Sequence, residues 1–129
     1  NTSGVTAAIN HAVAEFNQGN MKGWVASCSS SAAIIDEFPP HTWQGRNACA
    51  DWVSAFEANV KQNGITGGMV TLGTAWHVTV TGEHAYAVYP ATYTYQQHGK
   101  SMKESGTFAF VLQKTSAGWL IAAWSWAAH

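Results

Sequence analysis

Residues 34–52 read Ile34-Ile-Asp-Glu-Phe-Pro-Pro-His-Thr-Trp-Gln-Gly-Arg-Asn-Ala-Cys-Ala-Asp-Trp52. The segment opens as an apolar strand that ends in a carboxylate, Asp36, and Pro39 and Pro40 then exclude regular structure. After Gly45 the apolar residues recur at helical steps of three and four, at Ala48, Trp52, Val53, Phe56 and Val60. This order places one carboxylate beside a rigid turn and a helix start, an arrangement typical of a pocket mouth.

The rest of the chain divides into a helical half and a strand half. Helical periodicity predicts helices over residues 5–16, 21–26 and 46–62, with a polar connector over 27–31 and a first strand over 32–37. Period-two alternation then predicts strands over 69–81, 84–96, 102–114 and 119–127, with a bulge or bend at Pro90. Helices followed by a strand meander indicate an α+β fold in which an antiparallel sheet curls around the helices.

Composition limits the classes of function. The 129 residues are 47% hydrophobic and only 10% charged, with a net charge of −1, which indicates one folded domain spanning residues 1–129. Lys and Arg are scattered rather than clustered, so no nucleic-acid partner is expected. No apolar run approaches the ~20 residues of a membrane span. The low charge and a start at Asn1 favour a periplasmic or secreted protein whose leader has been removed.

The two cysteines, Cys28 and Cys49, allow two interpretations. They are either two buried free thiols or one disulfide, and a disulfide requires an oxidising compartment. Their separation excludes a CxxC redox pair. The histidines show no HxH or HExxH spacing, so no metal is expected, and Gly-x-Ser-x-Gly is absent.

The order of elements resembles the nuclear transport factor 2-like superfamily, which includes ketosteroid isomerases and SnoaL-like cyclases. The resemblance rests on the strand ending in Asp36 with its proline turn, on Trp43-Gln-Gly45, and on the C-terminal segment Gly118-Trp-Leu-Ile-Ala-Ala-Trp-Ser-Trp126. It implies a cone-shaped fold whose sheet wraps the helices around a deep apolar pocket. It also implies a homodimer formed through the outer sheet face.

The resemblance carries over to individual positions with mixed results. Asp36 falls where ketosteroid isomerases place their general base, and Trp124 matches an aromatic residue that lines the pocket. The oxyanion tyrosine of those enzymes falls at Ala12, and their second acid falls near Thr107 or Phe108. None of these side chains is an acid, so steroid isomerase activity is not expected.

The candidate catalytic residues are therefore Asp36 and His41. Asp36 is either an acid/base residue or a structural carboxylate, and His41 either forms a dyad with Asp36 or is a solvent-facing turn residue. The candidate ligand-binding residues are Ala12, Phe16, Trp43, Phe56, Tyr93, Phe108 and Trp124, whereas Trp52 and Trp76 are expected in the core.

Two classes of function follow from these residues. The first is a pocket for a small apolar or aromatic molecule, turned over without a cofactor by isomerisation, cyclisation, dehydration or hydrolysis. The second is a non-catalytic binding or association module whose pocket is filled by its own tryptophans.

Overall fold

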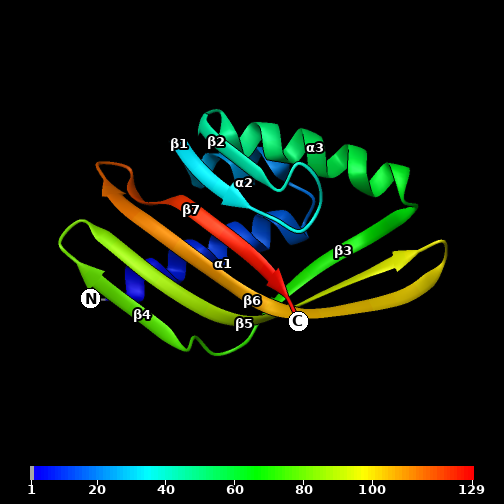
Figure 1. Cartoon of the computed structure of the whole chain (residues 1–129). Coiled ribbons are helices and arrows are strands. Elements are labelled where there is room, and N and C mark those ends of the chain that lie inside the picture. Colours follow the sequence, from blue (N-terminus) through cyan, green and yellow to red (C-terminus); the bar gives the residue numbers. More distant parts are fainter. Residues whose placement is uncertain (1) are drawn as a thin grey trace.

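The computed structural model describes residues 2–129 and contains three helices and seven strands (Figure 1). In chain order these are α1 (Ser3–Asn17), α2 (Met21–Ala26), β1 (Cys28–Ile35), β2 (Thr42–Arg46), α3 (Ala48–Gln62), β3 (Ile65–Leu72), β4 (His77–Thr81), β5 (His84–Gln97), β6 (Lys100–Thr115) and β7 (Gly118–Ala128). None of the described helices is long and apolar enough to cross a membrane.

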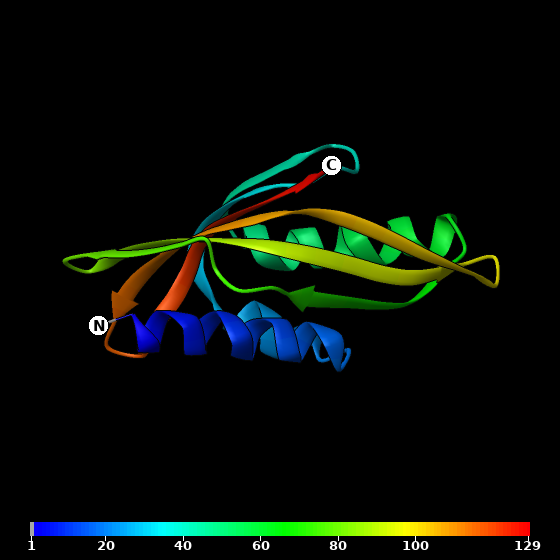
Figure 2. The same cartoon turned by 90° about the horizontal axis from the view of Figure 1, so that it is seen from below.

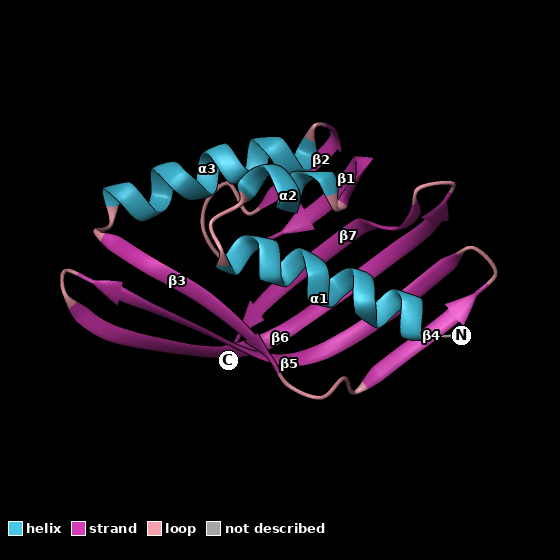
Figure 3. Ribbon diagram, turned by 180° about the vertical axis from the view of Figure 1, so that it is seen from behind, coloured by secondary structure: helices cyan, strands magenta, loops and turns pink. Residues whose placement is uncertain are grey.

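The strands form one curved sheet that covers the helices on one side. The strand order is β2-β1-β7-β6-β5-β3, and β4 pairs with β5 beyond the end of β3. All neighbours are antiparallel except β1 and β7, which are parallel. Figures 2 and 3 show the long β5 and β6 curving past the helices, which gather on the same side of the sheet. The predicted α+β cone is confirmed.

The region around the proline turn differs from the prediction. From Cys28 onward the expected polar connector over 27–31 belongs to β1, because Cys28 pairs with Ile121 of β7 and Ser31 pairs with Arg46 of β2. The segment after the turn is strand β2 rather than the opening of a helix. The helix α3 begins only at Ala48, after Asn47 takes a left-handed conformation with φ 68°.

The strand predicted over residues 69–81 is two strands, β3 and β4, joined by residues 73–76. Both pair with β5, one after the other, and Pro90 lies where β5 changes partner. The β5–β6 register is continuous through Pro90, so there is no bulge in that pair. The Gly73 amide donates a hydrogen bond to the Pro90 carbonyl on the side of β3 and β4. The Pro90 nitrogen lies on that same side, so its missing N–H removes no hydrogen bond between β5 and β6. Trp76 lies in the connection and is 58% exposed, so its expected core position is wrong.

The last strand carries a bulge that the sequence pattern did not indicate. The register of β7 on β6 shifts between the Ala123–Val111 pair and the Ile121–Leu112 pair. One residue is therefore unpaired, and Ile121 turns to the same side as Trp124 instead of the opposite one.

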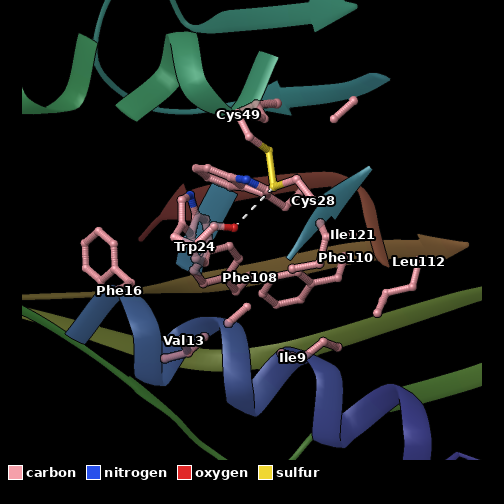
Figure 4. Close-up of a cluster of buried hydrophobic side chains, with 14 of the residues drawn as sticks. Ile9, Val13, Phe16, Trp24, Cys28, Cys49, Phe108, Phe110, Leu112 and Ile121 are labelled. Carbon is pink, nitrogen blue, oxygen red and sulfur yellow. Dashed lines mark hydrogen bonds between the residues drawn. A yellow bond between two sulfur atoms is a disulfide. The ribbon is translucent and has the colours of Figure 1, made fainter. Parts of the chain in front are cut away.

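The core lies between α1 and the inner face of the sheet. Ile9 and Val13 of α1 lie opposite Phe108 and Phe110 of β6 (Figure 4). The same figure shows Cys28 at the start of β1 bonded to Cys49 in the first turn of α3. The disulfide interpretation of the two cysteines therefore holds, and it fixes strand β1, which leads directly into Asp36, against the helix that carries Trp52.

Candidate functional site

A cavity of about 290 Å³ opens between the helices and the inner face of the sheet. Its walls come from α1, α2, α3, β3, β5, β6, β7 and the segment after β1. Most of the wall is aromatic and includes Phe16, Trp24, Trp52, Phe56, Phe108 and Trp124. A space of this kind, apolar with a few polar groups, is the usual form of a small-molecule site.

Asp36 is the polar centre of this cavity. Of the described residues it is the only charged one that is buried, with 9% of its surface exposed. Its Oδ1 accepts from the Glu37 amide at 2.7 Å, and its Oδ2 accepts from the Trp52 Nε1 at 2.9 Å. Burial raises the pKa of Asp36 above its ordinary value, while these two donors oppose the rise. A carboxyl group in this state can exchange a proton with a bound molecule.

Trp52 fixes the position of the Asp36 carboxylate. Its ring stacks on Phe56 with centroids 4.9 Å apart and meets Trp124 edge to face at 5.1 Å. Trp52 was expected in the core, and it is 3% exposed, but it also forms a wall of the cavity and a hydrogen bond at its centre. The packed rings leave its N–H little freedom, so Asp36 is held in one orientation.

A pair of carboxyl groups, Glu37 and Glu104, lies at the rim of the cavity and was not predicted. The Trp126 Nε1 donates to Glu37 Oε2 at 3.0 Å and to Glu104 Oε1 at 2.8 Å. Partial burial and hydrogen bonding with Glu104 raise the pKa of Glu37 to about 8. Glu37 therefore keeps its proton near neutral pH and can donate it toward Glu104.

One feature of the sequence could have indicated Glu104. It precedes Phe108 and Phe110 by even steps along the same strand, so it occupies an inward-facing position. A carboxylate on the buried face of a strand is unusual and suggests a site. Trp126 shares its strand face with Trp124, but nothing in the sequence indicates its contact with Glu37 and Glu104, because only the folded chain brings the three side chains together.

Three donors around the cavity have no hydrogen-bond partner within the described chain. These are the Nε1 groups of Trp24 and Trp124 and the hydroxyl of Tyr93. Burial raises the pKa of Tyr93 to about 12, so this hydroxyl keeps its proton. Buried polar atoms are normally paired, so three unpaired donors in residues of one cavity wall are unusual.

Five of the seven residues predicted to bind a ligand line this cavity: Phe16, Phe56, Tyr93, Phe108 and Trp124. Ala12 is fully buried and does not reach the cavity, because its neighbour Val13 faces it instead. Trp43 lies in β2 and packs on Phe38, with ring centroids 5.1 Å apart, so it supports the wall from behind.

The predicted dyad between Asp36 and His41 is not formed. The turn brings His41 back beside Asp36, but with φ 75° its ring Nδ1 lies 3.1 Å from the Asp36 main-chain oxygen. Both carboxylate oxygens of Asp36 already have other partners. His41 is exposed and is not part of the cavity wall.

No group of three or more His, Cys, Asp or Glu side chains in residues 2–129 has an arrangement that could hold a metal ion.

The curved sheet, the enclosed helices and the apolar cavity define the nuclear transport factor 2-like class of α+β proteins. Solved structures of low sequence identity share this fold. A nuclear transport factor 2-like superfamily protein from Salmonella enterica matches with a TM-score of 0.80 and 16% identity, over 96% of this chain and 87% of that one. A ketosteroid isomerase-like protein from Erwinia carotovora matches with a TM-score of 0.76 and 16% identity, over 98% and 95% of the two chains. A protein with a cystatin-like fold from Novosphingobium aromaticivorans matches with a TM-score of 0.76 and 18% identity, over 96% of this chain and 79% of that one.

The family can be stated more narrowly. The model of the SnoaL-like domain matches residues 5–126, and the chain belongs to this family. No curated protein sequence gives a significant match. At these identities the structural relatives show the fold, and the function has to be argued from the site.

Proposed function

We propose that this protein binds a small apolar or aromatic molecule in the cavity and that Asp36 moves a proton on it. The proposal rests on one observation above others: the buried charged residue of the described chain lies in an aromatic cavity. Burying a carboxylate is costly, and the chain orients this one with two donors on separate oxygens. A purely structural carboxylate would not need an open space beside it.

The reaction class is acid/base chemistry that needs no cofactor, such as isomerisation, cyclisation, dehydration or hydrolysis. Asp36 would take a proton from the bound molecule or return one to it. The oxyanion donors of ketosteroid isomerases have no acidic counterpart at Ala12 or near Thr107 and Phe108, so in this proposal Asp36 alone moves the proton.

The experiment is a ligand screen followed by one substitution. Native mass spectrometry and tryptophan fluorescence would identify compounds that enter the cavity, because Trp52 and Trp124 form its wall. Asp36→Asn should then abolish turnover of such a compound, with Asp51→Asn, an exposed carboxylate of α3, as the matched control.

The folding of Asp36→Asn has to be measured beside its activity. An amide offers one acceptor oxygen to two donors, the Glu37 amide and the Trp52 indole, so one hydrogen bond is lost while a buried charge is removed. These effects oppose each other, and we expect the free energy of unfolding to change by no more than about 2 kcal/mol. If turnover persists in a folded Asp36→Asn protein, Asp36 is not the acid/base residue.

A second candidate function, a non-catalytic association module, is favoured by the outer face of the sheet. Two rows of uncharged side chains cross this face, Tyr86–Val111–Ala123–Ala33 and Val88–Ala109–Ser125–Ile35. Tyr86 and Ile35 are 49% and 57% exposed. We propose that a second copy of the chain covers these rows, forming the expected homodimer.

The dimer can be tested without disturbing the cavity. Val111→Lys places a charge in the centre of the outer face, and light scattering should report a monomer instead of a dimer. A wild-type protein that is monomeric at all concentrations would exclude this interface. A dimer that binds none of the screened apolar compounds would favour association over catalysis.

A further inference from the structure

The walls of the cavity carry negative charge without any positive charge to balance it. Asp36, Glu37 and Glu104 contribute carboxyl groups, and no Lys, Arg or His is present among the described residues that line it. Carboxylates in partly buried sites are ordinarily neutralised by a basic side chain or a metal ion. Here the chain supplies neither, and the proton kept by Glu37 reduces the charge only in part.

The same walls are suited to a positive charge in a second way. Aromatic ring faces attract cations, and cages of several rings bind substituted ammonium groups in other proteins. The Glu37–Glu104 pair lies among such rings. Trp126 bridges the two carboxyl groups, and Tyr93 is the direct cross-strand neighbour of Glu104. Tyr95 follows on the same face, with its ring centroid 4.9 Å from that of Tyr93.

A third observation independently indicates a ligand. The rings of Trp24 and Trp124 line the cavity, and both residues are at least nine-tenths buried, at 2% and 4% exposed. The indole N–H of each is a buried donor without a partner within the described chain. Buried polar atoms are normally paired, so two such donors beside one cavity are unusual.

We infer that the cavity selects an organic cation: a protonated amine with an apolar or aromatic body, its ammonium group held by Glu37 and Glu104. This inference rests on the proposed function and narrows its substrate class. The ammonium group takes the place of the proton that Glu37 otherwise keeps. The body of the molecule lies among the rings near Asp36.

The inference predicts a linkage between binding and protons. Glu37 faces Glu104 on β6, Asp36 on its own segment, and Tyr93 and Tyr95 on β5, all of them acidic groups. An ammonium group among them favours the ionised form of Glu37 and lowers the pKa of that carboxyl from about 8. Binding at neutral pH should therefore release a proton to the buffer.

The test uses three probes that share one phenylethyl body: phenylethylamine, 2-phenylethanol and 3-phenylpropanoate. They carry a positive, a neutral and a negative end group, and their binding is followed by tryptophan fluorescence and calorimetry. We expect the amine to bind at least about tenfold more tightly than the alcohol, from the combined cation–π and charge-assisted contacts, and the carboxylate to bind least. Heats of amine binding should differ between phosphate and Tris buffers because a proton is released.

Matched variants assign the effect to the rim. Glu104→Gln keeps the size of the side chain and should remove most of the preference for the amine over 2-phenylethanol. Glu57→Gln makes the same change in net charge on an exposed part of α3 and should leave both affinities unchanged.

The outcomes separate this inference from the proposed function. If 2-phenylethanol binds the wild-type protein as tightly as the amine, the cation assignment is wrong and the apolar pocket stands. If the amine is preferred but Glu104→Gln keeps that preference, or if its heat of binding is the same in both buffers, the ammonium group is not held by this pair. If none of the three probes perturbs the protein up to its solubility limit, the proposed pocket fails together with the inference.

Discussion

Raising the pH should destabilise this protein through Glu37. The ordinary pKa of a glutamate is 4.5, whereas in the folded protein partial burial and the neighbouring Glu104 raise the pKa of Glu37 to about 8. Between these two values the folded state binds more protons at this side chain than the unfolded state does. The contribution of Glu37 to stability is therefore fully present below about pH 4.5 and is lost as the pH rises toward 8.

The magnitude follows from the number of protons and from the position of the side chain. One additional proton bound by the folded state corresponds to a slope of at most about 1.4 kcal/mol per pH unit. Glu37 lies at the rim and its side chain is exposed, so screening by water reduces this value strongly. We expect Glu37 to lower the free energy of unfolding by roughly 1–2 kcal/mol over the whole interval.

The assay is urea unfolding, followed by circular dichroism, at steps between about pH 5 and about pH 8. Wild type is compared with Glu37→Gln, whose neutral amide still accepts from Trp126 and can donate to Glu104. The difference between the two profiles isolates the contribution of residue 37. Glu57→Gln serves as the control, and its profile should follow the wild type. Parallel profiles for wild type and Glu37→Gln would refute the retention of this proton by Glu37.

Two further predictions concern the framework of the site. Gly106→Ala should lower the free energy of unfolding by about 1–3 kcal/mol in urea titrations, because an added methyl group would lie 2.7 Å from both the Trp126 ring and the backbone oxygen of Ala127. An unchanged midpoint would contradict this close approach of β6 and β7 at Gly106. Replacing Cys28 and Cys49 together by serine should cost about 3 kcal/mol, because the disulfide closes a loop with a sequence separation of 21. Wild type under a strong reductant should unfold at the midpoint of the double variant, and a midpoint unaffected by reductant would contradict a bridge that stabilises the fold.

The fold was predictable because the two periodicities lie in separate halves of the chain. The break between β3 and β4 at residues 73–76 could not be predicted from the sequence. Because the connection has four residues, an even number, the apolar residues stay at even-numbered positions from Val70 to Val80, as in one continuous strand. Strand β2 was missed because its five residues include only one large apolar side chain, Trp43. Such a segment becomes a strand through its pairing with β1 and not through its own pattern.

The site was predictable where it depends on local order in the sequence. Asp36 ends a strand whose alternation is clear, so its place at the cavity followed directly. His41 was assigned to Asp36 from their closeness in sequence, and the left-handed backbone at His41 directs the ring elsewhere. The contact among Glu37, Glu104 and Trp126 joins segments 22 to 89 residues apart, and sequence periodicity holds no information on such distances.

The rings around the cavity are also the core of the protein. Phe16, Trp24, Trp52 and Trp124 contact one another and at the same time form the walls. The cavity is thus a gap in the hydrophobic core, and a molecule that fills it would complete the packing of all three helices against the sheet. A ligand present at a hundred times its dissociation constant would add about 2.7 kcal/mol to the free energy of unfolding. The amount of folded protein in its natural surroundings would then follow the supply of the molecule it binds.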